Sequence, residues 1–161
     1  MKNRFVNETL KINEVNLDFD RENRTGLAEA VFCQGKSLQQ LLDICELLDE
    51  SGKPMLFTKL EAGIFKQLRE HLPDGVPDTF LDYDPVSRTA FHNPYPDRTK
   101  DLVAVVTGGS SDIPVAREAS RTLKFYGHEA LAIDDAGVAG LWRISERLAE
   151  LRERRIVICI A

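Results

Sequence analysis

The C-terminal third of the chain alternates largely apolar segments of strand length with amphipathic segments of helix length. The strand-like segments are residues 102–106, 129–133 and 156–160, and residues 112–126 and 140–154 separate them. Apolar runs of this length are typical of strands buried in a parallel sheet. The order β-α-β-α-β therefore predicts an α/β fold, namely the first half of a doubly wound, flavodoxin-like parallel sheet with right-handed crossovers.

Both helical segments carry apolar residues at helical spacing, which indicates the face that each helix buries. The expected inward-facing residues of 112–126 are Val115, Ala116, Ala119, Leu123 and Tyr126. Those of 140–154 are Leu141, Ile144, Leu148 and Leu151.

Before residue 93 the predicted elements are shorter and of mixed type. Apolar and polar residues alternate over 14–20, with Val15, Leu17 and Phe19 on one side, which predicts a half-buried strand. Ser37 is the predicted N-cap of a helix that Gly52 ends. The other predicted elements are strands at 29–33 and 55–58, a helix at 60–71, and a hairpin of 79–83 with 86–91. We expect a small α+β domain over residues 1–92.

A linker is predicted at residues 93–100, NPYPDRTK, and a second domain at 101–161. Ligands of such sheets bind beyond the carboxyl ends of the strands. Two of these ends are residues 107–112 and 134–140, whereas the third predicted strand reaches Ala161, the last residue. Residues 101–161 are also too few to supply the helices that normally cover both faces of a parallel sheet. We therefore expect 101–161 to be a partial, truncated domain.

Composition excludes several classes of protein. The 161 residues carry a formal net charge of −5, and neither half of the chain is basic, so we expect no nucleic-acid partner. The longest apolar run, 156–161, is far shorter than the roughly 18 residues that span a bilayer, so no membrane partner is expected. The first residues contain no apolar signal-peptide core. Three cysteines without a close pair predict a reducing, cytoplasmic location.

The cysteines and histidines are not predicted to be catalytic. Cys45 lies on the apolar face of its helix and Cys159 within a predicted strand, so both are expected in the core. Cys33, at a strand edge, is expected to be partly exposed, and nucleophilic use is not expected for it. The histidines are isolated from one another and from any motif, so we expect surface or helix-end positions for His71, His92 and His128.

The segment TGGSSD carries the strongest local chemical signal. It comprises Thr107, Gly108, Gly109, Ser110, Ser111 and Asp112. Glycines let the backbone approach an anion, hydroxyls add hydrogen-bond donors, and the following helix presents free N–H groups. The alternative is an ordinary strand-to-helix turn with a Ser/Asp cap, which needs the same residue types. The motif is not the G-x-G-x-x-G of dinucleotide-binding folds.

Three other segments each have two interpretations. Asp134 and Asp135 follow the second strand and belong either to the ligand-binding edge or to a solvated turn. Gly35-Lys36-Ser37 resembles the end of a phosphate-binding P-loop, but Ala30 stands where that motif needs glycine, which favours a helix start. The charged run 18–26 either forms an internal ion-pair network or supplies metal ligands, and the former is favoured because no third ligand is visible.

Two stretches together resemble a known enzyme family. They are LDFDRENRTGLAEAVFCQGKS at 17–37, and VAVVTGGSSDIPVAREAS with DDAGVAGLWR within 103–143. The pair resembles the carboxylase that begins biosynthesis of the nickel-pincer cofactor of lactate racemase. That family is related to class I phosphoribosylaminoimidazole carboxylase of purine biosynthesis, which matches only the second stretch. The resemblance therefore implies that 101–161 is a partial phosphoribosylaminoimidazole-carboxylase-like domain.

The resemblance implies a reaction and a set of ligand contacts. Such enzymes carboxylate the pyridine ring of nicotinic acid adenine dinucleotide with CO2 or bicarbonate as co-substrate, and release AMP. A cysteine attacks the ring as a covalent catalyst. No tightly bound cofactor is implied, and Mg²⁺ is an additional candidate. Ser111 and Asp112 would contact the ligand, and Thr107 to Ser110 would supply backbone donors. The second ligand loop would comprise Asp135, Gly137, Val138, Ala139 and Gly140.

This chain departs from the family pattern at two points. The family's reactive cysteine has no matching position here, and Trp142 stands where the family's histidine is expected. We therefore assign no catalytic residue within the chain. The alternatives are a nucleotide-binding, non-catalytic relative and a purine-pathway carboxylase or mutase. The resemblance also implies a homo-oligomer for the full-length protein.

Overall fold

The computed structural model describes residues 9–12 and 14–161, which form two compact units. The first unit extends to Asp82 and includes residues 90–93, and the second comprises residues 83–89 and 94–161. The predicted division at 93–100 stays a prediction. Among the described residues, no helix combines the length and the apolar character that crossing a bilayer requires.

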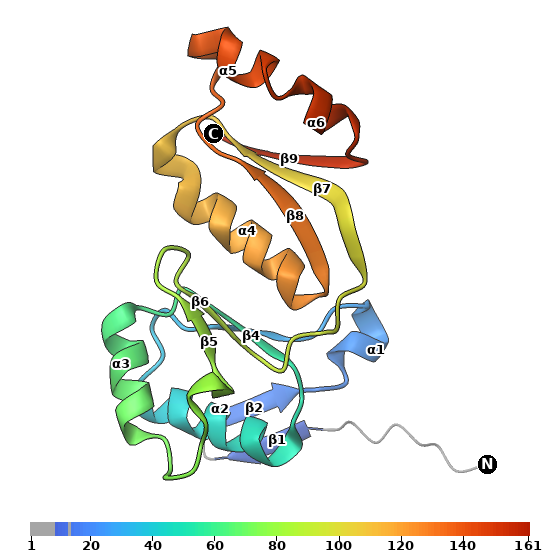
Figure 1. Cartoon of the computed structure of the whole chain (residues 1–161). Helices are drawn as coiled ribbons and strands as arrows, with labels where there is room; N and C mark the ends of the chain where they lie inside the picture. The colour runs from blue at the N-terminus through green and yellow to red at the C-terminus, as the bar shows by residue number, and fades with distance from the viewer. Residues whose placement is uncertain (1–8, 13) are drawn as a thin grey trace, which may run out of the picture. The chain divides into compact units, whose positions relative to one another are not determined.

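The described residues of the first unit form two small sheets, three α-helices and a 3₁₀ helix at Asp78–Phe80 (Figure 1). Its helices are α1 Arg21–Thr25, α2 Leu38–Ser51 and α3 Ala62–His71. Strands β1 Thr9–Ile12 and β2 Val15–Asp18 form an antiparallel pair. The second sheet has the order β3-β4-β6-β5, from β3 Ala30–Phe32, β4 Met55–Thr58, β5 Asp82–Asp84 and β6 Thr89–His92. Residues 83–89, within this last hairpin, belong to the second unit.

Helix α2 begins and ends where the sequence predicts. The Ser37 hydroxyl accepts the Gln40 N–H at 3.2 Å, and the Gln40 side chain accepts the Ser37 N–H at 3.0 Å, which forms a capping box. Gly52 ends the helix in the left-handed conformation, with φ 60°. The segment Gly35-Lys36-Ser37 is therefore a helix start, as the sequence favoured.

The second unit contains a parallel sheet with strand order β8-β7-β9. Its elements are β7 Thr99–Thr107, α4 Ile113–Phe125, β8 His128–Ile133, α5 Leu141–Ser145, α6 Leu148–Arg152 and β9 Ile156–Ile160. Val105 of the central strand pairs with Ala132 on one side and Ile158 on the other. This alternation confirms the predicted α/β class and parallel sheet.

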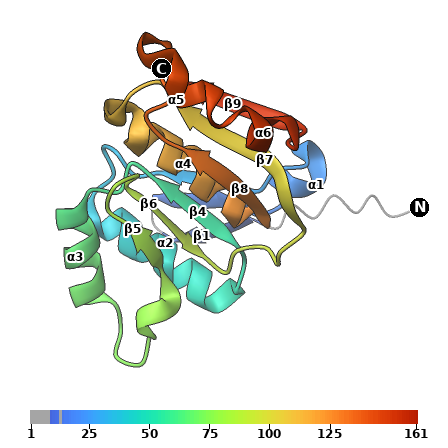
Figure 2. The same ribbon diagram turned by 45° about the horizontal axis from the view of Figure 1, so that its top comes forward.

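Helices cover both faces of this sheet (Figure 2). Helix α4 lies on one face and contributes the buried Ala116 and Phe125. Helices α5 and α6 lie on the other, where Ile144 and Leu151 pack against the cluster containing Val106 and Ile133. The prediction for Val115 is wrong, because its side chain is 52% exposed. It precedes Ala116 by one residue, so it lies about 100° around the helix from the buried face.

The predicted single helix at 140–154 is also wrong. A 3₁₀ turn precedes α5, which ends at Ser145, and α6 begins at Leu148. The Ser145 hydroxyl donates to the Leu141 carbonyl at 2.8 Å, and the Arg147 N–H donates to the Ile144 carbonyl at 3.1 Å in 3₁₀ fashion. Leu141 and Leu148, predicted to face inward, are exposed.

Strand β9 has the predicted bounds but is not buried. Ile156 is 56% and Val157 44% exposed, and Cys159 is exposed. Among the described strands β9 pairs only with β7, so it lies at an edge of the sheet.

Residues 94–98 are held against the end of α4. The Tyr95 N–H donates to the Phe125 carbonyl at 2.9 Å, and the Arg98 N–H donates to the Gly127 carbonyl at 2.7 Å. The Tyr95 ring meets Phe125 edge-on, with centroids 5.5 Å apart. This segment of the predicted linker therefore has defined contacts within the second unit.

Asp84 is a buried carboxylate in the turn at 83–89. It accepts hydrogen bonds from the Ser87 N–H at 2.9 Å and the Ser87 hydroxyl at 2.7 Å. Burial alone would raise the pKa of Asp84, but these hydrogen bonds and the charges of Arg117 and Arg121 lower it below its ordinary value.

We expect this carboxylate to make the second unit sensitive to acid. The pKa of Asp84 is lower in the folded than in the unfolded chain, so the ionised carboxylate stabilises the fold above about pH 4. This stabilisation is lost as the pH falls through the pKa of the folded state. The Asp84→Asn substitution removes this titrating group. The melting temperature of the variant is therefore expected to change less than that of the wild type between about pH 5 and pH 3. Thermal unfolding followed by circular dichroism tests this. Equal pH dependence in both proteins would contradict it, and Asp74→Asn, at an exposed loop position, is the matched control.

Candidate functional site

The turn after β7 is closed by its own polar groups. The Asp112 carboxylate accepts the Gly109 N–H at 2.9 Å, and the Asp112 N–H donates to the Gly109 carbonyl at 3.1 Å. Ser110–Asp112 forms a 3₁₀ turn that leads directly into α4. Asp112 therefore caps and shapes the glycine turn. The exposed hydroxyls of Ser110 and Ser111 have no hydrogen-bond partner among the residues that the structure describes.

Thr107 joins this turn to the loop after β8. Its side chain is fully buried, and its hydroxyl accepts the Asp135 N–H at 2.8 Å. Its carbonyl accepts the Ala136 N–H at 2.9 Å. One residue at the end of the central strand therefore binds the second loop through both its side chain and its backbone.

Gly137 brings the two loops into direct backbone contact. A Cβ atom at this position would lie 2.3 Å from the Gly108 carbonyl oxygen, which is much closer than real Cβ atoms approach any atom. Its φ of −62° is ordinary, so the requirement for glycine here comes from space alone. The structure thus brings the two sequence-predicted loops together at the carboxyl edge of the sheet.

The second loop is strained at its start and exposed at its tip. Asp135 has a φ of 55°, in the left-handed region that non-glycine residues rarely adopt. Its carboxylate pairs with Arg143 at 3.0 Å. Val138 is 78% exposed, and Ala139 is exposed beside it. The loop therefore offers apolar tip residues and a paired carboxylate.

A pocket of about 340 Å³ adjoins the second loop. It is lined by Asp134, Asp135, Trp142, Arg143, Glu146 and Arg147, among others. The Arg143 guanidinium lies 5.6 Å from the centre of the Trp142 ring, and Trp142 is 62% exposed. Arg143 was not singled out from the sequence as a site residue. An exposed tryptophan next to an arginine, directly after the predicted ligand loop, was the signal that could have identified it.

The edge carries an excess of carboxylates. Asp112, Asp134 and Asp135 all lie there. Among the described residues, only Asp135 of these three forms an ion pair. The expected backbone donors of the glycine turn are already used, because the Gly108 N–H donates to the Ile160 carbonyl and the Gly109 N–H to Asp112. Carboxylates accept hydrogen bonds from the hydroxyls of a sugar, whereas serine hydroxyls donate to anions. Within the described ranges, no group of three or more histidine, cysteine, aspartate or glutamate side chains lies close enough to hold a metal ion.

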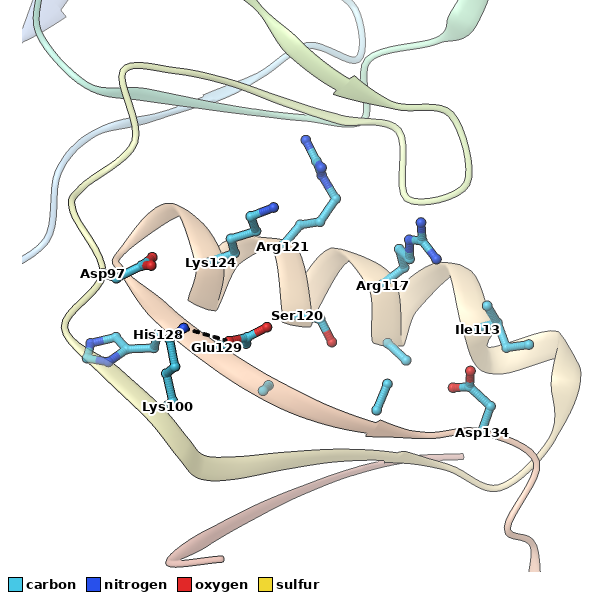
Figure 3. Close-up of a pocket in the computed structure, with 13 residues that line it drawn as sticks. Asp97, Lys100, Ile113, Arg117, Ser120, Arg121, Lys124, His128, Glu129 and Asp134 are labelled. Atoms are coloured by element: carbon cyan, nitrogen blue, oxygen red, sulfur yellow. Dashed lines mark ion pairs between the residues drawn. The ribbon is translucent and has the colours of Figure 1, made fainter.

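A larger groove lies between α4 and β8 (Figure 3). Its volume is about 490 Å³, and it extends from Asp134 near the carboxyl edge to His128 at the start of β8. Arg117, Arg121 and Lys124 project from α4 along one side of it. Lys100 and Glu129 pair across the opposite end at 4.0 Å.

The cysteines differ from prediction at two of three positions. Cys45 is buried as expected. Cys33 is only 5% exposed rather than partly exposed, because it lies two residues after the buried Val31 and so points to the same face of the extended chain. Burial raises the pKa of each of these two thiols to about 12, which disfavours the thiolate. Cys159, expected in the core, is exposed on edge strand β9.

This burial predicts the reactivity of the thiols. In the native protein, Cys159 is expected to react with Ellman's reagent at least about tenfold faster than Cys33 and Cys45, which need unfolding to react. Cys159→Ser is expected to remove the fast phase. Rapid reaction of a second thiol in that variant would contradict the described burial.

The charged run and the histidines can now be placed. Arg24 pairs with Asp18 and Asp20, which confirms the internal ion-pair network, and the hydrogen bond from Arg24 lowers the pKa of Asp18. His71 is exposed at the end of α3, as predicted. The surface prediction for His92 is wrong, because it is buried in β6 and its Nδ1 lies 2.9 Å from the Phe80 carbonyl oxygen.

Comparison with known proteins identifies the family to which the chain belongs. A model described as the LarB/PurE-like N-terminal domain matches residues 9–94, which is more than half of the chain. The chain belongs to the LarB/PurE-like family. This membership makes it part of a carboxylase-like family and confirms the resemblance seen in its sequence.

A relative in an archaeon matches along most of the chain. Uncharacterized protein MJ0165 of Methanocaldococcus jannaschii is 32% identical over 146 residues, which cover 89% of this chain. The aligned part represents 56% of that protein, so the chain spans little more than half the length of this relative.

Proposed function

We propose that the protein carboxylates the pyridine ring of nicotinic acid adenine dinucleotide and releases AMP, the first step of nickel-pincer cofactor biosynthesis. Its membership in the LarB/PurE-like family supports a carboxylase. The resemblance of residues 17–37 supports the cofactor branch over the purine branch. CO2 or bicarbonate is the proposed co-substrate.

The proposal is supported mainly by the direct contact between the loops at 107–112 and 135–140, which Thr107 and Gly137 bring about. This contact aligns a glycine turn, two serine hydroxyls and several carboxylates along one edge. A nucleotide presents phosphate oxygens, which need donors, and ribose hydroxyls, which need acceptors. The edge supplies both kinds of group within a few residues.

Each loop has a proposed role. The hydroxyls of Ser110 and Ser111 bind phosphate oxygens of the substrate, because the Gly108 N–H already donates to the Ile160 carbonyl at 2.8 Å. The Gly109 N–H likewise donates to Asp112. Asp112 accepts a ribose hydroxyl with the carboxylate oxygen that does not bind Gly109. The loop at 135–140 contacts the second half of the dinucleotide, and Trp142 provides an aromatic surface for a base.

The proposed reaction forms one carbon–carbon bond and breaks one phosphoanhydride bond. A pyridine ring carbon forms a bond to the carbon of CO2 and later loses its proton, while water cleaves the anhydride to release AMP.

Covalent activation of the ring would require a thiolate. Burial and the raised pKa of Cys33 and Cys45 argue against either one in that role. Cys159 is exposed on β9, but the family's reactive cysteine has no matching position among these residues. These observations together favour a second candidate function, nucleotide binding without chemistry by these 161 residues.

Isotope incorporation tests the proposal. The natural full-length protein is incubated with nicotinic acid adenine dinucleotide and ¹³C-bicarbonate, and AMP and labelled pyridine product are measured by chromatography and mass spectrometry. We expect both in equal amounts. Absence of both, with nucleotide still bound, would support the non-catalytic candidate. Turnover of aminoimidazole ribonucleotide instead would assign the protein to the purine branch.

A matched pair of variants tests the assigned residues. Ser111→Ala with Asp112→Asn is expected to weaken nucleotide binding at least about tenfold, the loss of roughly two hydrogen bonds to the ligand. Ser145→Ala, whose hydroxyl contacts only its own helix, is the control. Unchanged affinity in the double variant would refute the assignment.

A further inference from the structure

The turn at 83–89 and helix α4 share a chain of hydrogen bonds whose direction is fixed. The Arg121 Nε–H donates to the Thr89 hydroxyl oxygen at 2.8 Å. The Ser87 hydroxyl donates to the Asp84 carboxylate at 2.7 Å, because a carboxylate only accepts. The Thr89 and Ser87 hydroxyl oxygens lie 2.8 Å apart. With the Ser87 hydrogen already committed, Thr89 must be the donor to Ser87.

The chain of hydrogen bonds both begins and ends on α4. From Arg121 it passes through Thr89 and Ser87 to one oxygen of Asp84. The other oxygen of Asp84 lies 3.3 Å from an Nη atom of Arg117. Arg117 and Arg121 are four residues apart, so they stand one above the other on the helix. Two successive turns of α4 are therefore attached to the same polar cluster.

The cluster is buried, which makes its partners hard to replace. Asp84 is 8% exposed, Ser87 3% and Thr89 0%. In surroundings with little water, consecutive hydrogen bonds polarise one another, and a missing partner leaves a costly unsatisfied group. The cluster is specific for one axial and rotational position of α4, because both arginines must reach it together.

The position of α4 determines the position of the ligand turn. The helix begins at Ile113, immediately after Asp112, whose carboxylate holds the Gly109 N–H. Arg117 lies about one helical turn from that start. Any shift of α4 along its axis therefore carries Asp112 away from Gly109.

We propose that Asp84, Ser87 and Thr89 are positioning residues, which hold α4 through Arg117 and Arg121 and so keep the turn at 108–112 in its ligand-binding shape. None of the three needs to touch the ligand. The ligand-binding part of this inference rests on the proposed function, whereas the effect on the turn does not.

Hydrogen exchange of the 161-residue protein without ligand tests the positioning. Thr89→Val keeps the shape of the side chain but removes its hydroxyl, and Thr89→Ser keeps the hydroxyl. We expect Thr89→Val to speed amide exchange at Gly109 and along residues 113–121 about tenfold, and Thr89→Ser to keep it near the wild-type rate. Amides of β7 and β8 are expected to keep their rates.

Two results would overturn the inference. One is unchanged exchange at Gly109 in Thr89→Val. The other is equal acceleration of exchange in α4 and in β7 and β8, which would indicate a general loss of stability.

If Thr89→Val does not fold, Asp84→Asn takes its place, with Asp74→Asn as control. AMP affinity is measured in parallel. Failure of the wild type to bind AMP would count against the proposed function, while the exchange data still decide the positioning role.

Discussion

Gly137→Ala is expected to separate the two loops of the candidate site and to weaken nucleotide binding. The added Cβ would lie 2.3 Å from the Gly108 carbonyl oxygen and 3.3 Å from its carbon, so backbone must move. The loop at 135–140 then loses its alignment with the glycine turn. We expect a stability loss of about 3 kcal/mol, at the upper end for overpacking, and an affinity for AMP weaker by at least about tenfold.

Calorimetric titration with AMP and chemical unfolding followed by circular dichroism measure the two effects. Gly63→Ala is the control, because a Cβ there meets nothing within 4 Å and α3 gains a better helix former. Wild-type affinity in Gly137→Ala would show that the joined loops are not the nucleotide site.

Gly127→Ala is expected to have the largest effect on stability. Gly127 has a φ of +83°, and a Cβ would lie 2.2 Å from the Pro96 carbonyl oxygen. Its carbonyl also accepts the Arg98 N–H, which holds residues 94–98 against the end of α4. Strain and collision act together, so we expect a loss of about 3–4 kcal/mol in the free energy of unfolding of the second unit.

Gly75→Ala separates the two causes. Gly75 also has positive φ, +96°, but a Cβ there meets nothing within 4 Å. We expect a cost of about 1 kcal/mol, from backbone strain alone. Chemical unfolding followed by circular dichroism, which reports on both units, measures the two variants. Equal losses in both variants would contradict the packing of residues 94–98 described here.

Local signals in the sequence predicted most of the fold. Ser37 and Gly52 set the ends of α2, because capping chemistry acts over a few residues. The apolar segments at 102–106 and 156–160 predicted parallel strands that the structure contains. Burial was less predictable, because it depends on what lies against each element. Val115, Leu141 and Cys159 are apolar side chains at suitable spacing, yet all three are exposed in the structure.

The candidate site was predicted in its parts but not in its connections. Both loops follow from strand order, since carboxyl ends of neighbouring parallel strands meet at one edge. The bonds from Thr107 to Asp135 and the space that demands glycine at 137 are contacts across almost thirty residues, and no local pattern encodes them. The buried cluster of Asp84, Ser87 and Thr89 was missed for the same reason, because a Ser/Asp-rich turn usually indicates solvent exposure.

A titration followed by two-dimensional ¹H–¹⁵N nuclear magnetic resonance tests the central claim most directly. Nicotinic acid adenine dinucleotide is added to the labelled 161-residue protein, and amide shifts are mapped onto the chain. We predict the largest shifts at residues 108–112 and 135–140, with the first unit unchanged. Shifts confined to the groove between α4 and β8, or no shifts at millimolar ligand, would contradict a nucleotide site at the carboxyl edge of the sheet.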